Sequence, residues 1–213
     1  VYSIIQRLVS EDSSLLALVV LRDLPNSSKH TRPNTVLYSI FNRIDEKLFT
    51  KEPNPFTPKN ATDLLVNVPM IKVQPVQKQD ALFLKELDVD GIKKYELDIL
   101  IRFGFEGLQL EDLDVAKYGT WFYYHGDDRV VRGGPPGFWE VVENWPETSS
   151  ALLAVGGEFS PDRVLFRSHF LTYPLSPARH RSYYFWATTS FLPRQIDLLQ
   201  RLGDEKYYQE TGK

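Results

Sequence analysis

Residues Leu97 to Phe103 read LDILIRF, a mostly apolar run of strand length, and a second such run, LLALVVL, occupies Leu15 to Leu21. Runs of this kind are typical of strands covered on both faces in a parallel sheet. Between them, apolar residues recur at helical spacing at Val36, Leu37, Ile40, Phe41 and Ile44. Helices that alternate with buried strands predict an α/β fold with a mostly parallel sheet and helices on both faces.

Further elements are predicted outward from these two strands. Other strand candidates are MIKV within Val68 to Val76, Thr120 to Tyr124, Ala151 to Val155 and Val164 to Phe170. Apolar periodicity predicts helices from Val1 to Val9, near Val89 to Tyr95 and from about Arg181 to Leu202. Three prolines between Lys51 and Thr62 indicate an exposed connection there.

Composition limits the classes of protein to which the chain can belong. The chain has 213 residues, 42% hydrophobic and 25% charged, a formal net charge of -3 and no cysteine. This predicts one folded domain over 1–213 with a C-terminal helical segment at about 181–213. Without a basic field or an apolar run of about 18 residues, we expect a soluble, cytoplasmic domain, with no nucleic acid and no membrane as partner.

The beginning of the sequence suggests a fragment. Val1 stands within apolar periodicity, without an initiating methionine or a secretory signal. Because a strand usually precedes the first helix of an α/β unit, we expect that the first strand lies upstream of residue 1.

The segment from Tyr118 to Glu147 carries the strongest functional signal. It reads YGTWFYYHGDDRVVRGGPPGFWEVVENWPE and follows a predicted strand into Gly-, Asp- and Arg-rich sequence. Open α/β proteins bind ligands at the carboxyl ends of strands. His125 beside Asp127 could act as a general base or acid, and Arg132 lies beside glycines that let a ligand approach the backbone. The alternative is a structural corner, in which the arginines pair with nearby carboxylates.

The segment resembles the formyltransferase superfamily, which includes methionyl-tRNA and glycinamide ribonucleotide formyltransferases. That family carries Gly-x-x-Asn-x-His after a buried strand, then Arg-Gly, an apolar helix and a later Asp-x-Gly beside a strand. Gly119 and Arg132-Gly133 match this spacing, Phe138, Trp139 and Val142 fall on the helix, and Val164 to Phe166 on the later strand. Over nearly its whole length the chain is similar to a bacterial branch with the signature HGD-x-R-x-x-RGGP-x-GFWE.

The chain departs from the family at the catalytic positions. Phe122 stands at the family's Asn, Tyr124 at its His, and Ser160 or, with a shifted gap, Asp162 at its Asp. His125 would point to the opposite face of a regular strand from Tyr124, unless a bulge or the strand end changes its direction. Either the chemistry has been rebuilt, or the scaffold remains with activity weakened or lost.

The resemblance implies a Rossmann-like α/β fold and transfer of a formyl group from 10-formyltetrahydrofolate to an amine, a small-molecule substrate for which an amino sugar is one option. In that scheme His125 shuttles the proton, Asp127 orients it and Tyr124 donates to the oxyanion. The remaining expected site residues are Arg129, Arg132, Gly133 and Gly134 for the substrate, and Phe103, Gly104, Phe105 and Asp162 for the cofactor.

Two other readings stay open: a non-catalytic binding or scaffold domain of the same fold, and a nucleotide-sugar or dinucleotide binder. No metal is expected, because His169 and His180 lack carboxylates at ligand spacing. The basic, aromatic stretch around Arg179 and Arg181 is typical of a docked C-terminal helix.

Overall fold

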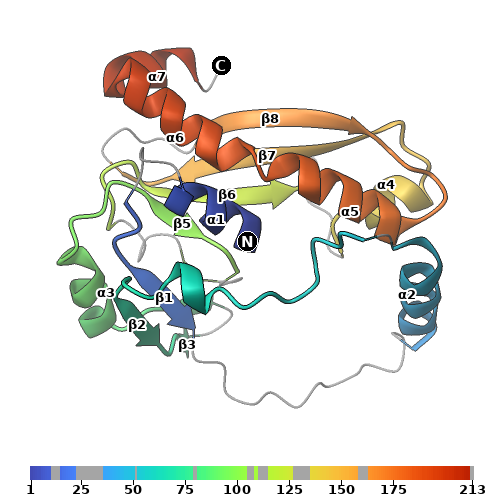
Figure 1. Cartoon of the computed structure of the whole chain (residues 1–213), viewed down its shortest axis with the longest axis horizontal. Helices are drawn as coiled ribbons and strands as arrows, with labels where there is room; N and C mark the ends of the chain where they lie inside the picture. The colour runs from blue at the N-terminus through green and yellow to red at the C-terminus, as the bar shows by residue number, and fades with distance from the viewer. Residues whose placement is uncertain are drawn as a thin grey trace.

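The computed structural model describes residues 1–10, 15–22, 36–50, 52–78, 81–104, 108–109, 115–126, 135–157 and 163–211. Its elements in chain order are α1 (Tyr2–Ser10), β1 (Val19–Arg22), α2 (Val36–Phe49), the 3-10 helix η2 (Thr62–Leu64), β2 (Met70–Val73), β3 (Val76–Lys78), β4 (Ala81–Phe83), α3 (Glu86–Lys93), β5 (Leu100–Arg102), β6 (Thr120–His125), α4 (Phe138–Val142), β7 (Glu147–Val155), β8 (Arg163–Leu171), α5 (Pro177–Thr188), α6 (Phe191–Leu202) and α7 (Asp204–Glu210) (Figure 1). The chain is thus a mixed α/β structure.

The largest described sheet has the strand order β5-β6-β7-β8. β5 and β6 are parallel, whereas β6 with β7 and β7 with β8 are antiparallel. The connection from β7 to β8 runs only from residue 156 to residue 162, too short for the crossover that a parallel pair needs. The mostly parallel sheet predicted from the helix–strand alternation is therefore not confirmed.

Two smaller sheets accompany the main sheet. β1 pairs in parallel with β2, and β3 forms an antiparallel pair with β4. The strand predicted over Leu15 to Leu21 begins at Val19, and its residues are partly exposed rather than covered on both faces. Its only ladder partner in the described chain is β2, which accounts for this exposure.

The main core lies between the four-stranded sheet and the helices α1, α6 and α7. Its buried side chains are Ile4, Leu8, Tyr118, Trp121, Leu152, Ala154, Leu165, Phe191, Leu192, Ile196, Leu199 and Tyr207. α5 continues along the same face of the sheet, so the described helices that pack on this sheet share one face (Figure 1). The predicted helices on both faces are thus not seen in the described part of the chain.

A second, smaller core joins the N-terminal strands to α3. Its buried members are Val73, Leu84, Ile92 and Leu108. Ile71 of β2 and Leu100 of β5 pack against it from the side, so this core borders the edge strand of the main sheet.

The C-terminal helical segment is divided into three helices rather than the single helix predicted over Arg181 to Leu202. α5 begins at Pro177, where the Ser176 hydroxyl accepts a hydrogen bond from Arg179 N (3.1 Å), and it ends at Thr188. Pro193 has no N–H and its ring would clash with the carbonyl of Thr189, so one helix cannot run through both. The Thr189 hydroxyl instead donates to Trp186 O (2.7 Å), which closes α5.

Two turns at the end of the sheet meet backbone to backbone. Gly119, before β6, has a φ of 72°, and Gly156, after β7, has the same value. A Cβ atom built on Gly119 would overlap the carbonyl oxygen of Gly156. Only glycine permits both this conformation and this approach, which aligns the start of β6 with the end of β7.

Candidate functional site

His125 ends β6 at the edge where the carboxyl end of the parallel strand β5 also lies. Its Cα lies opposite Ser150 of β7, and its Nδ1 is 2.7 Å from the Ser150 hydroxyl. The imidazole stacks on Phe185 of α5 with centroids 3.9 Å apart, and Tyr123 lies on the same strand face with its ring centroid 5.8 Å away. His125 is therefore held between the sheet and α5.

The hydrogen bonds around His125 involve the Ser150 hydroxyl. Its oxygen is 2.7 Å from Nδ1 of His125 and 3.2 Å from Tyr124 O, which can only accept. When the hydroxyl proton is donated to Tyr124 O, Nδ1–H of His125 donates to the Ser150 oxygen and Nε2 carries a lone pair. Burial lowers the pKa of His125 to about 4, so the ring is neutral at neutral pH. No residue in the described part of the chain hydrogen-bonds to Nε2.

Tyr124 and His125 lie on opposite faces of the sheet. Both residues pair in regular register with β7, Tyr124 opposite Ala151 and His125 opposite Ser150, without a bulge at this point. The geometry therefore does not bring the Tyr124 hydroxyl to the His125 imidazole. Tyr123 is the neighbour that shares its face, but the Tyr123 hydroxyl accepts a hydrogen bond from Leu192 N (3.2 Å) of α6.

The predicted cofactor residues that the structure describes are Phe103 and Gly104, at the end of β5. The ring of Phe103 stacks on that of Tyr123 with centroids 6.2 Å apart, which places it in one row with His125 and Phe185. Gly104 has a φ of 78°, and a Cβ atom there would find no atom within 4 Å. The other expected site residues, Phe105, Asp127, Arg129, Arg132, Gly133, Gly134 and Asp162, lie outside the described residues, as does Ser160.

His180 of α5 forms a second buried histidine site. Its Nδ1 accepts from Tyr173 N (3.2 Å), so Nε2 carries the proton and donates to the Thr148 hydroxyl at 2.6 Å. Thr148 is in turn 3.1 Å from the Thr172 hydroxyl. Burial lowers the pKa of His180 to about 4. Both ring nitrogens are used, so His180 joins α5 to the sheet and has no nitrogen left for a ligand.

The turn before α4 packs against Tyr184 of α5, whose ring lies near those of both histidines. Gly137 begins α4 with a φ of 74°, and a Cβ atom there would lie 2.8 Å from Cε1 and 3.1 Å from the hydroxyl oxygen of Tyr184. Glu140, one turn further, is 7% exposed, and Tyr184 is fully buried. Among the described residues, the Tyr184 hydroxyl has no hydrogen-bond partner. Burial raises the pKa of Tyr184 strongly and the Glu140 charge raises it further, so the hydroxyl stays protonated.

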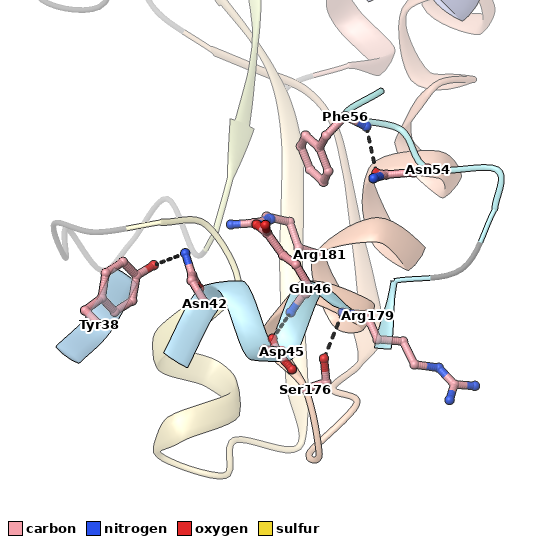
Figure 2. Close-up of polar contacts among 10 residues, drawn as sticks. Tyr38, Asn42, Asp45, Glu46, Asn54, Phe56, Ser176, Arg179 and Arg181 are labelled. Carbon is pink, nitrogen blue, oxygen red and sulfur yellow. Dashed lines mark hydrogen bonds and ion pairs between the residues drawn. The ribbon is translucent and has the colours of Figure 1, made fainter. Parts of the chain in front are cut away.

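Helix α2 supports the outer side of α5 (Figure 2). The Asp45 carboxylate accepts from Ala178 N (2.8 Å) in the first turn of α5, and Glu46 forms an ion pair with Arg181 at 3.3 Å. The indole of Trp186 donates to Pro53 O (2.7 Å), which ties the chain after α2 to α5 as well. These contacts keep α5, and with it Phe185 and His180, in place over the sheet.

Sequence reasoning missed His180 as a structural histidine, as well as the burial of Glu140 and of Tyr184. Thr148 and Thr172, the partners of His180, lie on other elements, so no local spacing could have indicated them. Glu140 is the last residue of the GFWE motif, and its place within an apolar helix was the one available signal.

Comparisons with known proteins do not assign the chain to a family: no model of a protein family matches the sequence, and no curated protein does either. The described helices include none that is long and apolar enough to span a lipid bilayer. Across the described ranges, no three acidic or histidine side chains gather in a way that could hold a metal ion.

Proposed function

We propose that this chain is a formyltransferase-like domain of the Rossmann-like class that transfers a formyl group to an amine, with His125 as the group that moves the proton. The main support for the proposal is the position, charge and hydrogen bonding of the His125 imidazole. It lies at the carboxyl ends of the two parallel strands, it is neutral, Ser150 fixes its Nδ1, and its Nε2 has no partner in the described chain. A positioned, neutral imidazole with a free nitrogen lone pair can accept a proton, which is one part of general acid–base catalysis.

The residues beside His125 suit a flat heterocycle. Phe103 and Tyr123 provide a row of rings next to the imidazole, and Gly104 leaves open space along the backbone at the same strand end. Such a combination of ring faces and accessible backbone supports 10-formyltetrahydrofolate as the donor, with Phe103 and Gly104 among the residues that would hold it. When bound, the donor supplies a formyl carbon attached to a folate nitrogen.

The reaction needs one proton to be moved and no oxidant. The acceptor nitrogen gains the formyl group and loses a proton, while the folate nitrogen loses the formyl group and gains a proton. Nε2 of His125 would take the proton from the acceptor amine and return it to the departing nitrogen. Ser150 keeps the ring oriented during both transfers, and proton transfer of this kind accelerates reactions by about 100- to 10,000-fold.

A second candidate is a binding or scaffold domain that keeps the fold without the reaction. Two observations favour it. Phe185 covers the imidazole at a centroid distance of 3.9 Å, and Tyr123, two residues before His125 on the same face, is engaged with α6 through its hydroxyl. A ring enclosed in this way can serve packing alone.

The test compares two buried histidines whose pKa burial lowers to about 4 in each case. His125→Gln is expected to lower formyl transfer by about 100-fold or more, with folate binding retained. His180→Gln is the matched control, because both nitrogens of His180 bind protein groups, and it should keep turnover within a few-fold while it lowers stability.

Binding is measured separately from turnover. With 5-formyltetrahydrofolate at about 100 times its dissociation constant, the free energy of unfolding should rise by about 2.7 kcal/mol. Equal activity of the two variants would refute the role of His125. No stabilisation by folate and no transfer with the unsubstituted chain would favour the scaffold domain.

A further inference from the structure

Helix α2 contacts α5 mainly through polar side chains. The buried Asp45 accepts a hydrogen bond from Ala178 N at 2.8 Å, and Glu46 forms an ion pair with Arg181 at 3.3 Å (Figure 2). Among the described residues, neither hydrophobic core includes a side chain of α2. A helix on the surface of a domain normally buries its apolar side, so α2 is oriented the other way round on α5.

The apolar side chains of α2 face solvent instead. The helix lies at the edge of the molecule beside α5 (Figure 1). With 3.6 residues per turn, four of its large apolar residues fall on one side of the helix. Single exposed apolar residues are common, whereas a row of them over adjacent turns marks an interaction surface. This row, the α2 stripe, is 47% to 69% exposed and consists of Ile40, Phe41, Ile44 and Leu48.

The spacing within the α2 stripe matches a helical partner. Phe41, Ile44 and Leu48 are separated by three and then four residues, which is the spacing along the contact line of two paired helices. A second helix can therefore insert its apolar side chains between those of α2. A lipid surface fits less well, because Asp45 and Glu46 balance the two cations of this helix, and its attraction to anionic lipid is weak.

One border of the α2 stripe is cationic. Arg43 and Lys47 are four residues apart, so they lie one above the other on the helix surface beside Ile40 and Ile44. Both side chains are exposed. Within the described part of the chain, neither forms an ion pair or a hydrogen bond. A partner with carboxylates along the facing border would pair with these cations, whereas a basic partner would be repelled.

The same charges disfavour a second copy of this chain as the partner. In an antiparallel pair of α2 helices related by a two-fold axis, the same border of each copy faces the other copy. Arg43 and Lys47 of both copies would then lie together and repel each other. In a parallel pair the cationic border would face the border of Asp45, which is covered by α5.

We propose that the α2 stripe is a docking site for an acidic amphipathic helix of another protein. Apolar side chains of that helix pack between Ile40, Ile44 and Leu48. Carboxylates along one of its borders pair with Arg43 and Lys47. The inference goes beyond the proposed function, because no step of formyl transfer requires an accessible α2.

The probes are two synthetic peptides, each about three heptads long, with leucine at both positions of the contact line. One carries glutamate and the other lysine at the positions beside this line, so like charges keep each peptide from pairing with itself. Fluorescence anisotropy of the labelled peptide measures binding to the whole chain. We expect saturable binding of the glutamate peptide with a Kd below about 100 μM, and binding of the lysine peptide at least about 10-fold weaker.

Variants on the surface of α2 test which residues hold the peptide. Ile44→Asn places an amide in the middle of the stripe and should weaken binding of the glutamate peptide by about 10-fold or more. Leu87→Asn is the matched control, because Leu87 is an exposed apolar residue of α3, and it should bind like the unsubstituted chain. The double variant Arg43→Glu with Lys47→Glu should prefer the lysine peptide over the glutamate peptide.

The proposal is overturned if neither peptide binds up to about 1 mM, or if both bind equally well. It is also overturned if Ile44→Asn lowers the free energy of unfolding far more than Leu87→Asn, because the stripe would then belong to the folded core. Dimers in analytical ultracentrifugation that Ile44→Asn abolishes would assign the stripe to a second copy instead. Binding to vesicles of anionic phospholipid that the same variant abolishes would assign it to a lipid surface.

Discussion

Acidification should destabilise the folded chain well above the pH at which its carboxylates protonate. Burial holds the pKa of both His125 and His180 at about 4, against about 6.5 in an unfolded chain. Between these values the unfolded chain binds more protons than the folded chain, so the free energy of unfolding falls as the pH falls. The contribution of the two histidines is fully present above about pH 6.5 and is lost towards pH 4.

The magnitude follows from the two pKa values. One histidine with this difference lowers the free energy of unfolding by about 2 kcal/mol between pH 7 and pH 5, and two together lower it by about 4 kcal/mol. That is a large fraction of the stability of an ordinary domain. Asp204 contributes little in this interval, because its pKa is lowered by Tyr118 and Lys117 and it stays ionised.

Urea unfolding followed by tryptophan fluorescence at pH 7 and pH 5 measures the effect, since the chain has four tryptophans. His180→Gln should be less stable at pH 7, because buried hydrogen bonds are lost, and its loss between pH 7 and pH 5 should fall to about 2 kcal/mol. NMR titration assigns each pKa separately. A free energy of unfolding that is the same at both pH values, or imidazoles that titrate near 6.5, would refute the reasoning.

Two further predictions concern stability. Asp45→Ala removes the acceptor of Ala178 N at the start of α5 and should lower the free energy of unfolding by about 1 to 2 kcal/mol. Denaturant titration measures this change, and an unchanged midpoint would show that the contact between α2 and α5 does not contribute to stability. Gly119→Ala would overlap Gly156 O and should cost more than about 3 kcal/mol, whereas Gly104→Ala, with a similar positive φ but open space around it, should cost only about 1 to 2 kcal/mol. Equal losses in the two glycine variants would show that close approach adds nothing to backbone strain.

Much of the secondary structure could be predicted from local patterns. α2 spans Val36–Phe49, where apolar residues recur at helical spacing, and β6 and β8 lie within a residue or two of the predicted strands. The single C-terminal helix was wrong, although Pro193 was visible in the sequence and marks the break. The direction of strand pairing did not follow from the apolar runs, because such a run indicates that both faces of a strand are covered but does not identify the neighbouring strand.

The candidate site was predicted in part. His125 at the end of β6 is a position that strand length and the following glycine indicate. Tyr124 and His125 are consecutive residues of a strand, so their side chains are predicted to lie on opposite faces of the sheet. The regular register of β6 with β7 agrees with this prediction. The neutral state of His125 was not predictable, because it depends on Ser150 and Phe185, which come from another strand and from α5.

By itself the sequence determined where helices and strands form, that the chain has enough apolar surface for a core, and which segment concentrates chemically active side chains. Those properties depend on periodicity and composition, which can be read from residues that are close together in the sequence. Only the tertiary structure decided that both nitrogens of His180 are bound, by Thr148 and Tyr173, while the buried Tyr184 hydroxyl has no hydrogen-bond partner among the described residues. The reason is physical: a protonation state or an unsatisfied hydrogen bond depends on groups that folding brings together from distant parts of the chain.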